Sequence, residues 1–170
     1  MPSTGALVLN LFAALWAALA LHSLGAPAWQ MAAPALISIV LSAWAFSRPQ
    51  PVYSPAMRQR ISRTVLWSSA IEGVLIFAAV NALHATGRDD LTIPAISAIV
   101  GAHFYPMAIG IKVPLYALTA TAMLALSGAA AFCLTAGPDR DAVTGAGCAL
   151  ILWLTSMAIT ARRRREAVAA

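Results

Sequence analysis

The sequence predicts an all-α fold, an integral membrane bundle of six transmembrane helices. The chain is 61% hydrophobic and only 10% charged, whereas soluble globular domains carry about 25% charged residues. Six apolar stretches are each long enough to cross a bilayer, and the charged residues gather in the connections between them. With 170 residues, the chain is expected to form a single six-span domain, residues 1–170, with no soluble module beside it.

The positive net charge of the chain, +5, is compatible with a nucleic-acid partner or with membrane topology. The Lys and Arg residues are confined to the connections and the C-terminal tail, as the positive-inside rule requires of a membrane protein. We therefore expect membrane lipids as partners and no nucleic acid.

The first two spans are predicted at Gly5–Leu21 and Trp29–Phe46. The first could be taken for a secretory signal, but no Lys or Arg precedes it, so it is interpreted as a transmembrane helix. Asn10 lies within the first two turns of this span, at a depth similar to that of Glu72. It either hydrogen-bonds a neighbouring helix as part of the packing or contributes to a ligand site.

A basic connection, residues 47–64, follows the second span, and a basic tail, residues 161–170, follows the last one. Ser54 followed by Pro55 is typical of an N-cap with proline at the first helical position, which predicts a short helix at the lipid headgroups. Alternatively, the positive charge of the connection 47–64 binds a cytoplasmic partner protein. The side chains expected to contact lipid headgroups are Arg58, Arg60, Arg63, Arg162 and Arg163.

The third and fourth spans are predicted at Val65–Leu83 and Thr92–Ile111. Pro106 lies inside the fourth span, where a proline leaves the carbonyl of Ala102 without its helical partner and bends the helix. The freed carbonyl is adjacent to His103. Irregular backbone at membrane depth is typical of binding sites in transporters, and a kinked helix with a purely structural role is the alternative.

The fifth and sixth spans are predicted at Val113–Leu134 and Ala142–Thr160. If the N-terminus is cytoplasmic, nine Lys and Arg residues face inside and only two, Arg88 and Arg140, face outside, so both termini are predicted to be cytoplasmic. Small residues from Ser127 to Ala131 form a surface that allows close helix packing, either within one protomer or between two protomers. A homodimer is therefore one of two alternatives.

The residues that carry chemistry centre on Glu72 and His103. At ~1.5 Å per residue, the two lie roughly 10 and 12 Å from the same side of the membrane, so they could meet as neighbours. Burial favours the uncharged form of a carboxyl group, and a nearby carboxylate favours the charged form of a histidine. A proton can therefore transfer between the two side chains near neutral pH. The candidate ligand- or proton-binding residues are Glu72, His103, Asn10, Ser68, Ser69 and Tyr105. No catalytic residue, metal site or cofactor is expected, because no corresponding motif is present.

The residues Glu72-Gly73, Asp90-Leu91, Pro94 and the run from Ile99 to Ala108, IVGAHFYPMA, resemble a pattern in small multispanning bacterial membrane proteins of unassigned function. The resemblance covers about a quarter of the chain. It implies a multi-pass architecture and a location in the bacterial inner membrane, and it implies no substrate.

Three functions are compatible with these features. The first is a small transporter or solute-binding component, proton-linked through Glu72 and His103. The second is a membrane enzyme that acts on a lipid or quinone, with the same two residues as general acid and base. The third is a non-catalytic subunit or assembly factor, in which the pair fixes the packing of two helices. The identity of the small-molecule ligand is not predicted.

Overall fold

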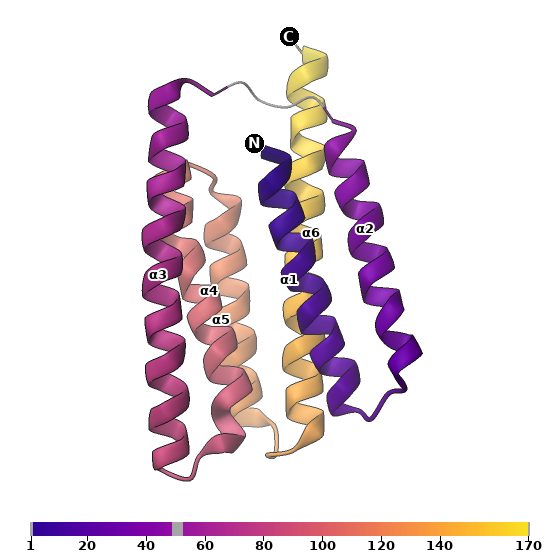
Figure 1. The fold of residues 1–170 in the computed structure, drawn as a ribbon, viewed down its shortest axis with the longest axis vertical. Coiled ribbons are helices and arrows are strands. Elements are labelled where there is room, and N and C mark those ends of the chain that lie inside the picture. The colour runs from indigo at the N-terminus through magenta and orange to yellow at the C-terminus, as the bar shows by residue number, and fades with distance from the viewer. Residues whose placement is uncertain (1, 49–52, 170) are drawn as a thin grey trace. The chain divides into compact units, whose positions relative to one another are not determined.

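The computed structural model describes residues 2–48 and 53–169. Across these residues, six helices are long and apolar enough to cross a membrane, in agreement with the predicted all-α, six-span fold. Short 3₁₀ helices, η1 (Ala28–Met31) and η2 (Asp89–Leu91), precede the second and fourth long helices. The long helices are α1 (Pro2–Ser23), α2 (Ala32–Phe46), α3 (Pro55–Ala85), α4 (Thr92–Ile111), α5 (Leu115–Cys133) and α6 (Pro138–Ala169) (Figure 1).

The chain divides into two compact units. The first unit contains α1, α2 and α6 from Gly145 onward. The second unit contains α3, α4, α5 and the first turns of α6, up to Thr144. Each unit is described by itself below.

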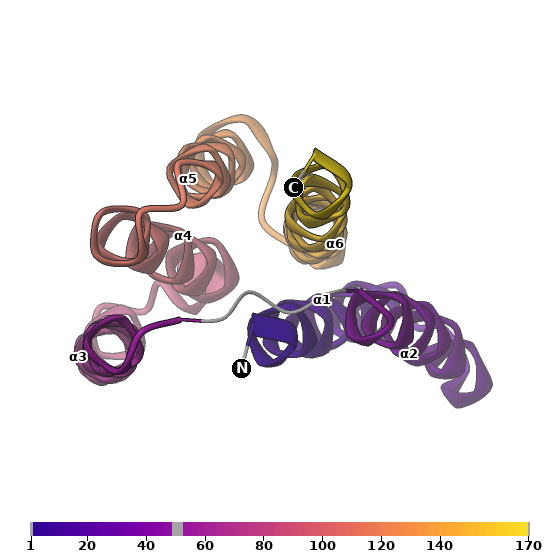
Figure 2. The ribbon, with the colours of Figure 1, turned by 90° about the horizontal axis from the view of Figure 1, so that it is seen from above.

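In the first unit, α1 runs antiparallel to its neighbours α2 and α6, and the start of α1 and the end of α6 lie at the same end (Figures 1 and 2). Small residues allow the close approach of α6 to α1. A Cβ atom at Gly145 would lie 2.7 Å from the carbonyl oxygen of Trp16 and 3.1 Å from the Cβ of Ala20. Only glycine therefore fits at this crossing.

In the second unit, α4 packs between α3 and α5 (Figure 2). A Cβ at Gly101 would lie 2.8 Å from the Cβ of Met123 in α5, and a Cβ at Gly110 would lie 2.5 Å from the side chain of Thr64 in α3. The two glycines thus let α4 approach both neighbours closely. A buried hydrogen bond of 2.7 Å from Ser127 to Ser97 joins α4 and α5.

The start of α3 differs from the sequence prediction. Ser54 caps the helix by accepting a 3.3 Å hydrogen bond from the Met57 amide, and Pro55 occupies the first turn, as expected. However, no separate short helix forms, because α3 continues without a break for 31 residues. No further proline lies within α3 after Pro55, and a helix that is already capped extends at little cost.

The end of α3 is fixed by Gly87, which adopts a left-handed conformation with φ +67°. The amide of Arg88 donates to the Leu83 carbonyl at 2.8 Å, and the amide of Gly87 donates to the His84 carbonyl at 3.1 Å. This pair of hydrogen bonds is the Schellman motif, which satisfies the last carbonyls of a helix. It turns the chain into η2 and α4.

Candidate functional site

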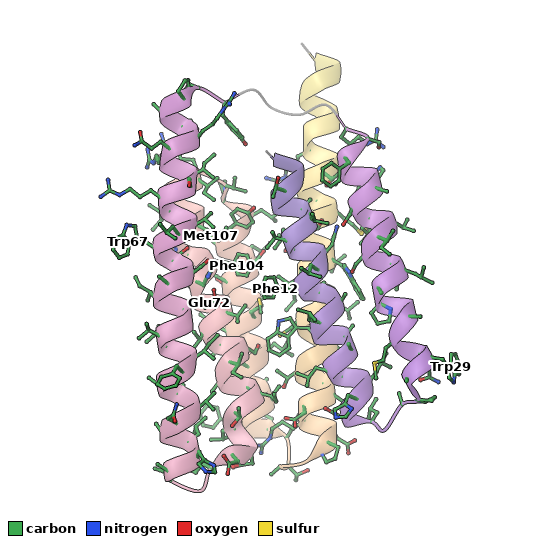
Figure 3. All side chains as sticks on the ribbon, in the orientation of Figure 1. Phe12, Trp29, Trp67, Glu72, Phe104 and Met107 are labelled. Carbon is green, nitrogen blue, oxygen red and sulfur yellow. The ribbon has the colours of Figure 1, made fainter. Side chains whose placement is uncertain are left out.

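The structure brings Glu72 and His103 together at the contact between α3 and α4. The Nδ1 atom of His103 contacts the Oε2 atom of Glu72. The side chain of Glu72 is only 16% exposed and that of His103 only 13% exposed. Figure 3 shows Glu72 on the side of α3 that faces α4, with Met107 close by. The uniform rise of the two helices explains the meeting, since it places both residues at one depth.

The second ring nitrogen of His103, Nε2, lies 2.8 Å from the sulfur of Met107, one turn further along α4. A thioether is a weak acceptor and donates nothing, so this nitrogen carries a proton in the arrangement that makes the best contact. One further proton then lies between Nδ1 and the carboxylate. It belongs either to the imidazolium or to the carboxylic acid, and it can pass between them without disturbing the contact to Met107.

A groove of about 470 Å³ lies between α3 and α4 beside this pair. Two residues that line the groove are close in sequence to the pair of Glu72 and His103. Ser68 precedes Glu72 by one turn of α3, and Pro106 follows His103 by three residues in α4. The lining is mostly apolar, and its charged residues are two arginines from the beginning of α3. The groove residues are Arg60, Arg63, Thr64, Trp67, Ser68, Ile71, Pro106, Ile109 and Gly110.

The two serines expected beside Glu72 have different surroundings. Ser68 is buried, lines the groove and donates a 3.2 Å hydrogen bond to the Val65 carbonyl. Ser69 is exposed. The serine that precedes Glu72 by one helical turn therefore shares its inner face, whereas the one that precedes it by three residues lies on the outer side.

Tyr105 does not join the pair. Its hydroxyl lies 2.9 Å from the Oγ1 of Thr121 in α5, and its side chain is exposed. Two residues along a helix correspond to a rotation of about 200°, so Tyr105 and His103 lie on different faces of α4. The hydroxyl of Tyr105 thus contributes to the contact between α4 and α5.

Asn10 belongs to the first unit and is fully buried there. Its Nδ2 donates to the hydroxyl of Ser42 at 3.1 Å, and its backbone carbonyl accepts from Ser38 at 2.7 Å. The indole of Trp153 in α6 donates to Ser38 at 3.0 Å. These bonds join α1, α2 and α6 and fit the packing alternative for Asn10. Sequence reasoning missed the link between Ser38 and Trp153.

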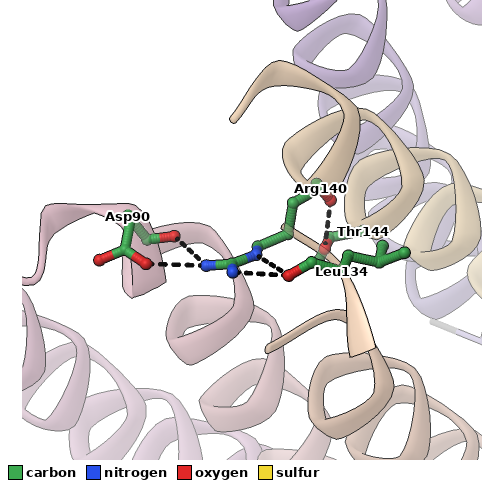
Figure 4. A network of polar contacts seen from close by, with 4 residues as sticks. All are labelled: Asp90, Leu134, Arg140 and Thr144. Atoms are coloured by element: carbon green, nitrogen blue, oxygen red, sulfur yellow. Dashed lines mark hydrogen bonds and ion pairs between the residues drawn. The ribbon is translucent and has the colours of Figure 1, made fainter. Parts of the chain in front are cut away.

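Sequence reasoning also missed the role of Arg140, which was expected only as a charge outside the membrane. Arg140 is 5% exposed, and its Nε and Nη2 atoms donate to the Leu134 carbonyl at 3.3 and 2.7 Å. Its Nη1 atom donates to the backbone carbonyl and the carboxylate of Asp90 at 3.1 and 2.9 Å (Figure 4). One guanidinium thus joins the end of α5 to η2, directly before α4. The available signal was an arginine between two aspartates, Asp139 and Asp141, directly before the apolar part of α6.

The basic residues expected at the headgroups fall into separate groups. Arg60 and Arg63 are exposed and line the groove. The Nε of Arg58 donates to the Tyr53 carbonyl at 3.1 Å, so this side chain folds back on the start of α3. Arg162 is exposed, and the side chain of Arg163 lies outside the described part of the structure.

The fold and the site define the chain as a multi-pass membrane protein, on the length and apolarity of the described helices. Within residues 2–48 and 53–169, no three His, Cys, Asp or Glu side chains gather closely enough to hold a metal ion. No family model, curated protein or solved structure matches the chain.

Proposed function

We propose that this chain is a small transporter or solute-binding component of the bacterial inner membrane, proton-linked through Glu72 and His103. The observation that carries the proposal is the contact of these two side chains at the end of the groove between α3 and α4. Carboxylate and histidine residues inside a membrane typically form proton relays and substrate sites, since placing them there is costly.

A purely structural role explains the pair less well. The same unit already joins two helices at membrane depth with a hydrogen bond between the hydroxyls of Ser127 and Ser97. Hydroxyls provide such a link without the desolvation cost of an ionisable pair. What the carboxylate and the imidazole add is a proton that can be exchanged, beside a groove that can admit a solute.

The distribution of positive charge supports an orientation with both termini in the cytoplasm. Nine Lys and Arg residues would then face inside and two would face outside. In that orientation, the end of the groove that carries Arg60 and Arg63 faces the cytoplasmic surface. A solute would reach the proton-exchanging pair from that side.

The proposal is tested by thermal unfolding of the detergent-solubilised protein with a panel of solutes at several pH values. A solute that binds only the folded state adds about 2.7 kcal/mol of stability when present at a hundredfold excess over its dissociation constant. We expect at least one solute to raise the Tm of the wild type. The shift should disappear in Glu72→Gln and His103→Ala. If the function is proton-linked, binding should also depend on pH in the wild type and lose that dependence in Glu72→Gln.

The control is Tyr105→Phe, a change on the other side of α4. It should keep the full response to the solute. If no solute raises the Tm, and the two variants of the pair only unfold at lower temperature, the pair is structural and the chain is a non-catalytic subunit or assembly factor. Reconstitution in liposomes with an internal pH indicator then separates binding from proton-linked transport.

An enzyme that acts on a lipid or quinone is the second candidate. Trp67 and Ile109, which line the groove, are 61% and 75% exposed, so the groove is open at its side. An apolar substrate could therefore enter from the bilayer and meet Glu72 and His103 as general acid and base. Mass spectrometry of lipids and quinones incubated with the protein would detect turnover, which the Glu72→Gln variant should abolish.

A further inference from the structure

The groove between α3 and α4 combines two kinds of surface. Arg60 and Arg63 supply two positive charges at one end. They are three residues apart on α3 and therefore lie on neighbouring parts of one face. Beyond them the lining is mostly apolar and includes Trp67, Ile71 and Ile109. A ligand that fits both parts has a negatively charged head and an apolar tail.

The dimensions of the groove suit one hydrocarbon chain. Arg60 and Ile71 are separated by about 16 Å along the helix axis. The volume, about 470 Å³, lies within the range of small-ligand pockets. The exposed side chains of Trp67 and Ile109 leave the groove open at its side, so a ligand with an apolar tail can enter without leaving the bilayer.

The position of the charges agrees with a lipid that remains in its leaflet. Arg60 and Arg63 precede the apolar part of α3, where the polar headgroups of the bilayer lie. A phosphate between the two guanidinium groups would accept hydrogen bonds from both, which is the geometry that arginine provides for phosphate. The acyl chain below it would then point toward Ser68, one turn from Glu72.

We infer that the groove binds an anionic membrane lipid, with its phosphate between Arg60 and Arg63 and one acyl chain along Trp67, Ile71 and Ile109. The inference rests on the proposed function, because it names the chemical class of the ligand at the same site. The lipid's tail would end beside Ser68, one turn from Glu72, so the Glu72→Gln substitution should change its affinity.

The test uses the full chain in nanodiscs of zwitterionic phosphatidylcholine at low salt, to which brominated phosphatidylglycerol is added. Bromine quenches tryptophan fluorescence on contact, and the quenching of Trp67 is obtained by subtracting the signal of Trp67→Phe. This substitution should leave the fold intact, since the side chain is 61% exposed. The charge variants are the double variant Arg60→Gln/Arg63→Gln and the matched control Arg58→Gln. Arg58 lies on the same helix, and its Nε is bonded to the Tyr53 carbonyl.

We expect quenching of Trp67 to saturate at about one lipid per chain. The double variant should bind about thirtyfold more weakly, since each arginine near an anionic surface contributes roughly a fivefold gain in affinity. Arg58→Gln should bind as the wild type does. Equal quenching by brominated phosphatidylcholine, or an equal loss in Arg58→Gln, would mean that only surrounding bulk lipid is detected and would overturn the inference.

The outcome also separates this inference from the proposed function. If the lipid binds as described and Glu72→Gln changes neither its affinity nor the pH dependence of binding, the lipid site stands and the proton-linked function fails. If no anionic lipid binds at Trp67 while a water-soluble solute raises the Tm through Glu72 and His103, the function stands and the lipid assignment is wrong.

Discussion

Replacing Arg140 by methionine is expected to lower the free energy of unfolding by about 2 to 4 kcal/mol. Methionine keeps much of the volume of the side chain and removes all its hydrogen bonds. The Leu134 carbonyl, which accepts from Nε and Nη2, would lose both donors. Leaving such an acceptor without a partner costs about 1–3 kcal/mol, and the lost bonds come from a charged group, which makes them stronger than average.

The ion pair with Asp90 contributes less than its 2.9 Å distance suggests. The side chain of Asp90 is 39% exposed, so water screens its interaction with Arg140. We assign it at most about 1 kcal/mol. In a double-mutant cycle with Asp90→Asn, the coupling energy should therefore be small compared with the full effect of Arg140→Met.

The assay is unfolding of the purified protein in mixed detergent micelles, followed by circular dichroism. The matched control is Arg88→Met, because Arg88 is an exposed arginine in the link before α4. It should change the free energy of unfolding by less than about 0.5 kcal/mol. Hydrogen exchange should also speed up at the amides near Leu134 in Arg140→Met. If the two variants are equally stable, the guanidinium of Arg140 does not hold the helix ends together.

Other variants test the packing and the limits of the site. Gly101→Val should lower the free energy of unfolding by about 1–3 kcal/mol, because the valine side chain would overlap Met123. Gly73→Ala adds a carbon with no atom near it, so it should be neutral or should stabilise the protein by up to about 1 kcal/mol. Chemical unfolding of the two variants measures both effects. Lys112 adopts φ 60° at the end of α4, so Lys112→Gly should raise the Tm and Lys112→Val should lower it. Tyr105→Phe removes one hydrogen bond at a partly exposed side chain, so it should change stability by about 1 kcal/mol or less and leave solute binding unchanged, as measured by thermal shift.

The six spans and the meeting of Glu72 with His103 were predictable because both depend on regular geometry. A helix rises by the same amount at every residue, so depth in the membrane follows from counting along the chain. The cap formed by Ser54 and Pro55 was predictable for a similar reason, since its chemistry is local. Whether the pair acts on a ligand remains a prediction.

Properties that depend on contacts between distant residues were not predictable. Arg88 and Arg140 look alike as basic residues between spans, and only the fold shows that Leu134 and Asp90 surround the second of them. The groove depends on where Gly110 meets Thr64, which no periodicity reveals. The same holds for the hydrogen bond from the indole of Trp153 in α6 to Ser38 in α2, within the first unit.

The unequal lengths of α3 and α4 have a consequence for the response of the protein to its membrane. Gly110 lies beside Thr64 and α4 ends at Ile111, so the residues from Pro55 to Arg63 continue past the end of α4. A helical segment this short is marginal by itself, and the cap formed by Ser54 stabilises it. Anionic headgroups would neutralise its arginines and keep it folded. The length of α3 that is helical should thus report the surface charge of the membrane, and amide exchange over residues 55–63 should slow as anionic lipid is added.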